Sequence, residues 1–246
     1  MYAGGDRSEY GSGVAPVREC DQHEQDNAVA RKRWNGEFET SEEQQAIKRR
    51  LMLREAGAAF TERGFHNVSL DELAARLGIS KTVFYYYFRD KNHLLQNCVE
   101  IGFELAETAL DRAEALDDCG LEKAACFMHA YVTGITSEMG ACAVLTELNS
   151  LNAEDLAAVR KRQRAFGRRL VKLIEEGRKD GSIQVDNARV AASWILSPPL
   201  SIPRLSQLWQ EQAGDRLAEQ YANLARRSLG PSASESGADA PGSPGP

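Results

Sequence analysis

The sequence predicts an all-α protein, with an N-terminal three-helix helix-turn-helix domain and a larger C-terminal helical domain. Residues 17–197 contain no proline and are rich in Ala, Leu, Glu and Arg, a composition that favours long helices. Amphipathic segments preceded by helix-capping residues recur along this stretch, and no alternating run of β-branched residues competes with them. We therefore expect helices throughout residues 41–229.

Composition excludes several classes of protein. The hydrophobic share of 42% is sufficient for a core, so wholesale disorder is excluded. Five scattered cysteines are typical of reduced thiols, and no apolar run has the length of a membrane span or a signal segment, so we expect a cytoplasmic protein without membrane association. A net charge of −6 argues against indiscriminate coating of nucleic acid but leaves room for a local basic face.

Four segments follow from the composition along the chain. Residues 1–40 lack an apolar period and predict a flexible arm with one basic cluster, Arg31 to Arg33, which would be a solvated tail or an extra DNA contact. Residues 230–246 are mostly Gly, Pro and Ser and predict a disordered tail. Between them we expect a helix-turn-helix domain at 41–95 and a second helical domain at 96–229.

Four helices are expected in residues 41–104. Ser41 with Gln44, and Ser69 with Glu72, form capping-box patterns that open the first and second helices. Gly64 and Gly78 are stop signals at the two C-terminal ends. Ser80 and Asp90 are expected to cap the third and fourth helices.

The third helix, 81–88, carries the strongest functional signal. Two short helices joined by a tight Gly-containing turn form a helix-turn-helix arrangement. Phe84 and Phe88 share one face and are expected in the core. The residues that point elsewhere suit base edges, thymine methyls and phosphates in a major groove; they are Lys81, Thr82, Tyr85 and Tyr86. The alternative interpretation is that the tyrosines pack in the core.

Residues 56–95, AGAAFTERGFHNVSLDELAARLGISKTVFYYYFRDKNHLL, resemble the DNA-binding domain of the TetR family of bacterial transcriptional regulators. The family pattern "GVSKGTLYYYF" corresponds here to Gly78 to Phe88, and "SKExLL" to Asp90-Lys91 through Leu95. Two residues depart from it: Thr82 replaces a small Gly, and Val83 replaces a hydroxyl residue that commonly touches phosphate. The loss of that hydroxyl removes one backbone contact without threatening the fold.

The resemblance implies a role for each matching residue. Ser69, Tyr87 and Lys91 would contact phosphate, whereas Lys81, Thr82, Tyr85 and Tyr86 would face base edges. Charge alone does not reveal this site, because residues 42–104 hold nine basic and nine acidic side chains.

The C-terminal region is expected to contain about five further helices. Residues 121–139 carry a wide apolar face, and Asn152 can cap a long helix that Gly177 and Gly181 would end. Asp186 is expected to begin a helix that breaks at Pro198-Pro199. A last helix would follow Pro203, with apolar residues at Leu205, Leu208, Trp209, Leu217, Tyr221 and Leu224.

In the family that the chain resembles, this region encloses a small-molecule pocket, and the last two long helices pair with a second copy. Pairing also has a physical reason, because a helix-turn-helix monomer reads only a few base pairs. We expect Trp194, Leu217, Tyr221 or Leu224 in that interface. The predicted pocket residues are Phe127, Met128, Tyr131, Leu145, Leu148, Phe166, Leu170 and Trp194, with ordinary core packing as the alternative.

Segments such as "RRLVKLIEEGRKDGSI" look like family members that sense acyl-CoA compounds. A basic stripe would then meet the anionic phosphates, or else be a solvated helix face; it consists of Arg160, Arg162, Arg164, Arg168 and Arg169. The partners expected are therefore double-stranded operator DNA, a small hydrophobic effector and a second copy of the chain.

The sequence contains few signals for metal binding, thiol redox chemistry or catalysis. Cys126 and His129 have the spacing of a metal-ligand pair, but no second pair accompanies them, so no metal is expected. Cys119, Cys126 and Cys142 would be the candidates for a redox switch. Catalytic motifs and phosphate-binding Gly loops are missing from the sequence, so neither an enzyme nor a cofactor is expected.

The chain is interpreted as a ligand-responsive repressor. The alternatives are an architectural or interaction module without a ligand, and an enzyme with an accessory DNA-binding domain.

Overall fold

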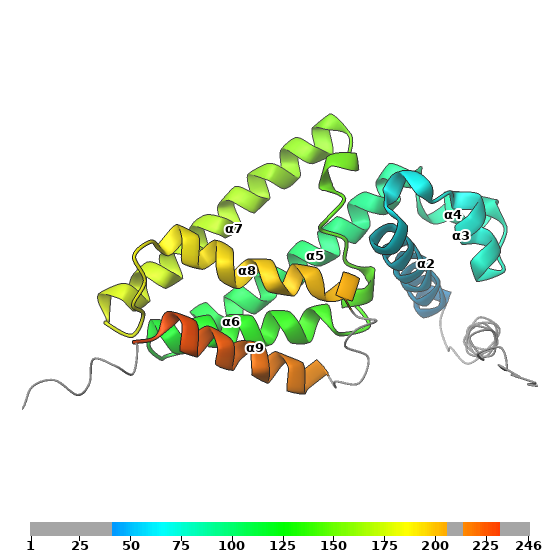
Figure 1. Cartoon of the computed structure of the whole chain (residues 1–246). Helices are drawn as coiled ribbons and strands as arrows, with labels where there is room; N and C mark the ends of the chain where they lie inside the picture. Colours follow the sequence, from blue (N-terminus) through cyan, green and yellow to red (C-terminus); the bar gives the residue numbers. More distant parts are fainter. Residues whose placement is uncertain (1–40, 206–213, 232–246) are drawn as a thin grey trace, which may run out of the picture. The chain divides into compact units, whose positions relative to one another are not determined.

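The computed structural model describes residues 41–205 and 214–231 (Figure 1). Within these ranges the regular secondary structure is entirely helical, which confirms the predicted fold class. The predicted N-terminal arm with Arg31 to Arg33, the C-terminal tail beyond residue 231, and the helix residues Leu208 and Trp209 lie outside the described residues. The contacts discussed below belong to residues 45–231, which fall in one compact unit.

The N-terminal helices begin and end where local signals predict. They are α2 (Ser41–Arg63), the 3-10 turn η1 (Phe65–Asn67), α3 (Leu70–Leu77), α4 (Lys81–Tyr87) and α5 (Lys91–Glu114). The Ser69 hydroxyl accepts from the Glu72 amide at 3.1 Å, and Gly78 ends α3 with a left-handed φ of 65°. Asp90 caps α5 by accepting from the His93 amide at 2.7 Å. Ser80 occupies the N-cap position of α4 but makes no side-chain capping bond.

The C-terminal helices pack around α6 (Figure 1). They are α6 (Gly120–Ile135), the 3-10 turns η2 (Gly140–Cys142) and η3 (Leu148–Ser150), α7 (Ala153–Lys179), α8 (Ala188–Leu205) and α9 (Gly214–Leu229). Helix α6 contacts α5, α7, α8 and α9, and α5 runs without a break across the predicted domain boundary at 95–96. The boundary therefore stays a prediction.

Helix α7 passes through one of its two predicted ends. Asn152 caps it as expected, by accepting from the Asp155 amide at 2.9 Å, and Gly181 follows its C-terminus with φ of 81°. Gly177, however, lies inside α7, because its role is close packing. A Cβ on Gly120 at the start of α6 would lie only 2.2 Å from Gly177 Cα, so the crossing of these helices requires two glycines.

The predicted break of α8 at Pro198-Pro199 is wrong, because the helix continues to Leu205. Ile195, Pro199 and Ile202 are all buried at spacings of four and three, so one packed face spans the prolines. Within this continuous helix the Ser201 hydroxyl also donates to the Pro198 carbonyl at 2.7 Å. The start also differs: α8 begins at Ala188, and Asn187 rather than Asp186 accepts from the first amides.

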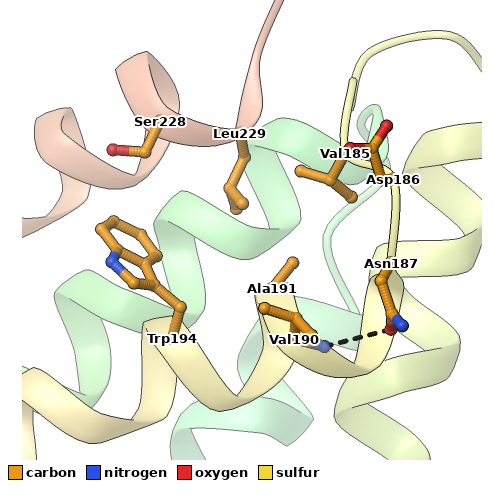
Figure 2. Close-up of a pocket in the computed structure, with 8 residues that line it drawn as sticks. All are labelled: Val185, Asp186, Asn187, Val190, Ala191, Trp194, Ser228 and Leu229. Atoms are coloured by element: carbon orange, nitrogen blue, oxygen red, sulfur yellow. Dashed lines mark hydrogen bonds between the residues drawn. The ribbon is translucent and has the colours of Figure 1, made fainter.

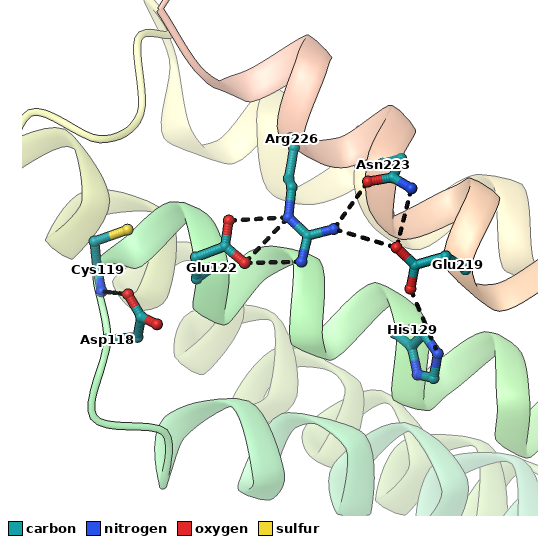
Figure 3. A network of polar contacts seen from close by, with 7 residues as sticks. All are labelled: Asp118, Cys119, Glu122, His129, Glu219, Asn223 and Arg226. Atoms are coloured by element: carbon teal, nitrogen blue, oxygen red, sulfur yellow. Dashed lines mark hydrogen bonds and ion pairs between the residues drawn. The ribbon is translucent and has the colours of Figure 1, made fainter.

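A polar network joins α6 to α9 (Figure 3). The Arg226 guanidinium donates to both carboxylate oxygens of Glu122, with Nε at 2.9 Å from Oε1 and a second nitrogen at 2.8 Å from Oε2. Glu219 lies 3.8 Å from the other side of Arg226 and 4.0 Å from His129 Nε2. These contacts fix the register of α9 along α6.

Candidate nucleic-acid interface

The interface candidate is the outer face of α4. Phe84 and Phe88 are buried at 0% and 1% exposure and anchor the helix against the core. The predicted base-facing residues point away from it: Tyr85 is 50% and Tyr86 is 71% exposed, and Lys81 and Thr82 are exposed as well. The alternative in which Tyr85 and Tyr86 are core residues is therefore wrong. Helices that carry such side chains next to a tight turn fit the major groove.

Lys81 has an acidic partner on the preceding helix. Its ammonium lies 2.8 Å from the Asp71 carboxylate, and this hydrogen bond raises the pKa of Lys81. Both side chains are exposed, so the pair is weak in water. DNA can therefore compete for Lys81, and a bound duplex would bring its own negative charge towards Asp71.

The predicted phosphate contacts lie on different elements. The Ser69 hydroxyl already accepts one bond as the cap of α3 and keeps its own proton free to donate. Tyr87 is half-buried, with its ring centroid 5.0 Å from that of Tyr86, and burial raises its pKa. These phosphate roles remain predictions.

Lys91 lies in an unexpected position. Its ammonium sits 4.1 Å from the centroid of the buried Phe65 ring, a cation–π contact, and partial burial lowers the pKa of Lys91. Phe65 and Asp71 are missing from the residues that the sequence predicts for this site. Each contact joins residues of different elements, Asp71 of α3 with Lys81 of α4 and Phe65 of η1 with Lys91 of α5, so no helical periodicity relates them.

The predicted effector pocket divides into separate groups. Phe127 and Tyr131 of α6 stack with centroids 5.7 Å apart, and Phe166 of α7 lies 6.2 Å from Phe127. Met128 and Leu170 are also buried, whereas Leu145 and Leu148 are half-buried in the segment between α6 and α7. Leu145 lines a different small cavity, together with Thr61 and Leu200. The assignment of all these residues to one pocket stays a prediction.

Trp194 lies apart from that group, in an open cleft of about 540 Å³ (Figure 2). Its ring and Val190 from α8 face Leu229 and Ser228 at the end of α9. Val190 is 65%, Trp194 is 42% and Leu224 is 44% exposed, whereas Leu217 is buried and Tyr221 half-buried. Exposed apolar side chains are thus present on both of the last two helices.

The basic stripe is partly neutralised by α5. Arg162 contacts Glu100 and Glu107, and Arg169 contacts Asp111 and Glu114. These two arginines therefore hold α7 to α5. Within the described residues, Arg160, Arg164 and Arg168 are exposed and make no ion pair.

The residues considered for metal and thiol chemistry lie on several different elements. His129 faces Glu219, and the described residues contain no cluster of three potential metal ligands. Burial raises the pKa of Cys142, so its thiol stays protonated, and Cys119 and Cys126 are half-buried free thiols.

Comparison with known proteins decides the family. Residues 52–98 match the model of bacterial regulatory proteins of the tetR family, and residues 117–229 match a tetracyclin repressor-like C-terminal domain. The two matches together cover more than half of the chain. The chain belongs to the TetR family. The segment that matches the bacterial regulatory proteins contains the exposed face of α4.

Curated relatives of this TetR-family chain match over the DNA-binding region. The HTH-type transcriptional regulator BetI of Escherichia coli O127:H6 is 34% identical over 80 residues, which is 32% of this chain. The match spans only 41% of the relative's length.

Solved structures share the fold over most of the chain. The ketosteroid transcriptional regulator KstR2 of Mycobacterium tuberculosis aligns with a TM-score of 0.66 and 15% identity, covering 81% of this chain and all of that one (100%). The TetR-family regulator PfmR from Thermus thermophilus aligns with a TM-score of 0.62 and 23% identity, covering 72% and 97% of the two chains. AibR in complex with isovaleryl coenzyme A and operator DNA aligns with a TM-score of 0.60 and 21% identity, covering 72% and 96%. No helix in the described ranges is long and apolar enough to cross a bilayer.

Proposed function

We propose that the protein is a homodimeric repressor that binds a palindromic operator and is released by a hydrophobic small molecule. The observation that carries this proposal is the α4 face, where four polar or aromatic side chains are exposed above two buried phenylalanines. Repression is the simplest mode of action, because a dimer bound to its operator can act by occluding the DNA.

The last two helices support a dimer. Val190, Trp194 and Leu224 are large exposed apolar side chains of α8 and α9, and the first two line the open cleft. Exposed apolar patches of this kind mark protein interfaces. A two-fold pair would present two copies of α4 to half-sites about one helical turn apart, or a multiple of it, and so raise affinity and specificity.

The effector class follows from the core of α6 and α7. Phe127, Tyr131 and Phe166 form an aromatic cluster, and the Tyr131 hydroxyl is buried without a hydrogen-bond partner among the described residues. An unpaired buried hydroxyl within an apolar cluster suits a mostly apolar ligand with one hydrogen-bonding group. The neighbour AibR was solved with isovaleryl coenzyme A and operator DNA, which supports acyl-CoA compounds as first candidates.

The operator for this test is a duplex that the protein itself selects from a pool of random DNA sequences. Acyl-CoAs of several chain lengths are titrated calorimetrically, and binders are then added to the protein–operator complex in a mobility-shift assay. We expect at least one acyl-CoA to bind and to release the operator. Release requires preferential binding to the DNA-incompetent state, since moving a population from 1:99 to 99:1 needs about 10⁴-fold preference.

A module without a ligand is the second candidate, and the tight aromatic core favours it, because Phe127 and Tyr131 are 0% exposed. Failure of all acyl-CoAs to bind or to alter operator affinity would reject the acyl-CoA version. A wider screen of apolar compounds without any binder would favour the second candidate.

A further inference from the structure

A carboxylate of the C-terminal domain holds the turn between α2 and α3. Glu147, in the segment between α6 and α7, accepts from the Phe65 amide at 3.3 Å and from the Ser150 hydroxyl at 3.4 Å. Phe65 opens η1, and the residue at its N-cap position is Gly64, which has no side chain to accept that amide. Glu147 therefore supplies the missing cap from 82 residues away in sequence.

The same phenylalanine supports Lys91. Its ring is 6% exposed and packs against Phe60 at a centroid distance of 5.3 Å. The Lys91 ammonium lies over this ring at 4.1 Å, and the described residues give Lys91 no acidic partner. The ring is thus the group that fixes where this cation sits at the start of α5.

We propose that Glu147 is a positioning residue for DNA binding, which acts through Phe65 to hold the Lys91 ammonium ready for a phosphate. The inference rests on the proposed phosphate contact of Lys91. The inference also links the segment between α6 and α7 to a DNA contact. A movement of that segment that withdraws Glu147 would remove the hydrogen bond to the Phe65 amide and so loosen the support for the ring under Lys91.

The variants Glu147→Ala and Glu147→Gln separate positioning from charge. Both remove a negative charge, so simple electrostatics predicts tighter DNA binding for both. Glutamine keeps an oxygen that accepts from the Phe65 amide, whereas alanine removes the acceptor. We expect Glu147→Gln to bind DNA at least as well as the native chain, and Glu147→Ala to bind all sequences several-fold more weakly.

The salt dependence of DNA affinity is a measurement that a general loss of stability would not change. We expect both Lys91→Ala and Glu147→Ala to lower the log–log slope of DNA affinity against salt by about one unit. In a Lys91→Ala background, Glu147→Ala should cause no further loss. Side-chain NMR provides a check without DNA: the ring-current shift of the Lys91 ε-methylene protons should shrink in Glu147→Ala and in Phe65→Leu, and persist in Glu147→Gln.

The outcomes distinguish this inference from the proposed function. If Lys91→Ala loses one unit of slope while Glu147→Ala keeps the native slope and affinity, the positioning role is wrong and the Lys91 contact stands. If Lys91→Ala itself leaves slope and affinity unchanged, both the phosphate contact and the inference that rests on it are overturned.

Discussion

The four exposed side chains of α4 are expected to contact bases, whereas the flanking residues are expected to contact phosphates. Tyr85 and Lys81 face outward and would meet base edges, where a good contact is worth about 1–3 kcal/mol of discrimination. Lys81 starts from an exposed pair with Asp71, which costs little to exchange for DNA.

Substitution of these residues tests the orientation of α4. We expect Tyr85→Ala and Lys81→Ala to lower the ratio of operator to random-DNA affinity by roughly ten-fold or more, because direct base contacts are lost. Binding is measured by titration at several salt concentrations. The matched control is Lys172→Ala, which removes another exposed, ion-paired lysine from α7. An unchanged operator preference in both α4 variants would mean that another face enters the groove.

Caps could be predicted from the sequence because they are local. Ser69 with Glu72, and Asp90 with His93, are pairs three residues apart, so the chain order itself brings donor and acceptor together. The contact of Glu147 with Phe65 joins residues 82 apart, and its partner is a backbone amide without any side-chain signature. Only the packed structure reveals such a pair.

Helix packing shows the same division between local and distant causes. Gly177 resembles a helix end in the sequence, yet its lack of a side chain serves the crossing of α6 over α7. The prolines of α8 predict a break by their missing amides, but a continuous buried face outweighs that loss. Likewise, Arg162 and Arg169 look solvated in the sequence and are ion-paired to α5 in the fold.

The α6–α7 crossing can be tested with alanine. Gly120→Ala places a Cβ 2.2 Å from Gly177 Cα, so the helices must separate, and we expect a loss of about 1–3 kcal/mol in the free energy of unfolding. Gly167→Ala is the control in the same pair of helices, since its new Cβ has no atom within 4 Å beyond the neighbouring backbone of its own helix. That variant should gain about 0.5–1 kcal/mol, as alanine favours a helix interior. Chemical denaturation measures both, and equal stability of the two variants would argue against the close crossing.

Assembly is the property of the whole molecule on which the regulator depends. The apolar side chains exposed on α8 and α9 belong to the only two helices that the family resemblance assigns to pairing, and Val190 is the most exposed of them at 65%. Val190 is missing from the interface residues predicted from sequence, because its neighbour Trp194 dominates the apolar pattern of that segment.

Charge placed on this surface should separate the two copies. We expect Val190→Asp and Leu224→Asp to shift the protein to monomer in sedimentation experiments and to weaken operator binding by at least ten-fold, since buried unpaired carboxylates are costly. Leu116→Asp is the control, because Leu116 is a similarly exposed apolar residue, at 37%, outside α8 and α9. A dimer that survives both substitutions with native operator affinity would place the interface elsewhere.

The most direct measurement is selection of DNA from a random duplex pool by the full-length protein, followed by sequencing of the bound fraction. A two-fold dimer that reads the major groove with α4 should enrich an inverted repeat whose half-site centres lie about 10–10.5 base pairs, or a multiple of that spacing, apart. The Tyr85→Ala variant should enrich the same spacing with a degenerate position in each half-site. Enrichment of no sequence, or of a single unrepeated half-site, would show that the protein is not a dimeric reader of a palindromic operator.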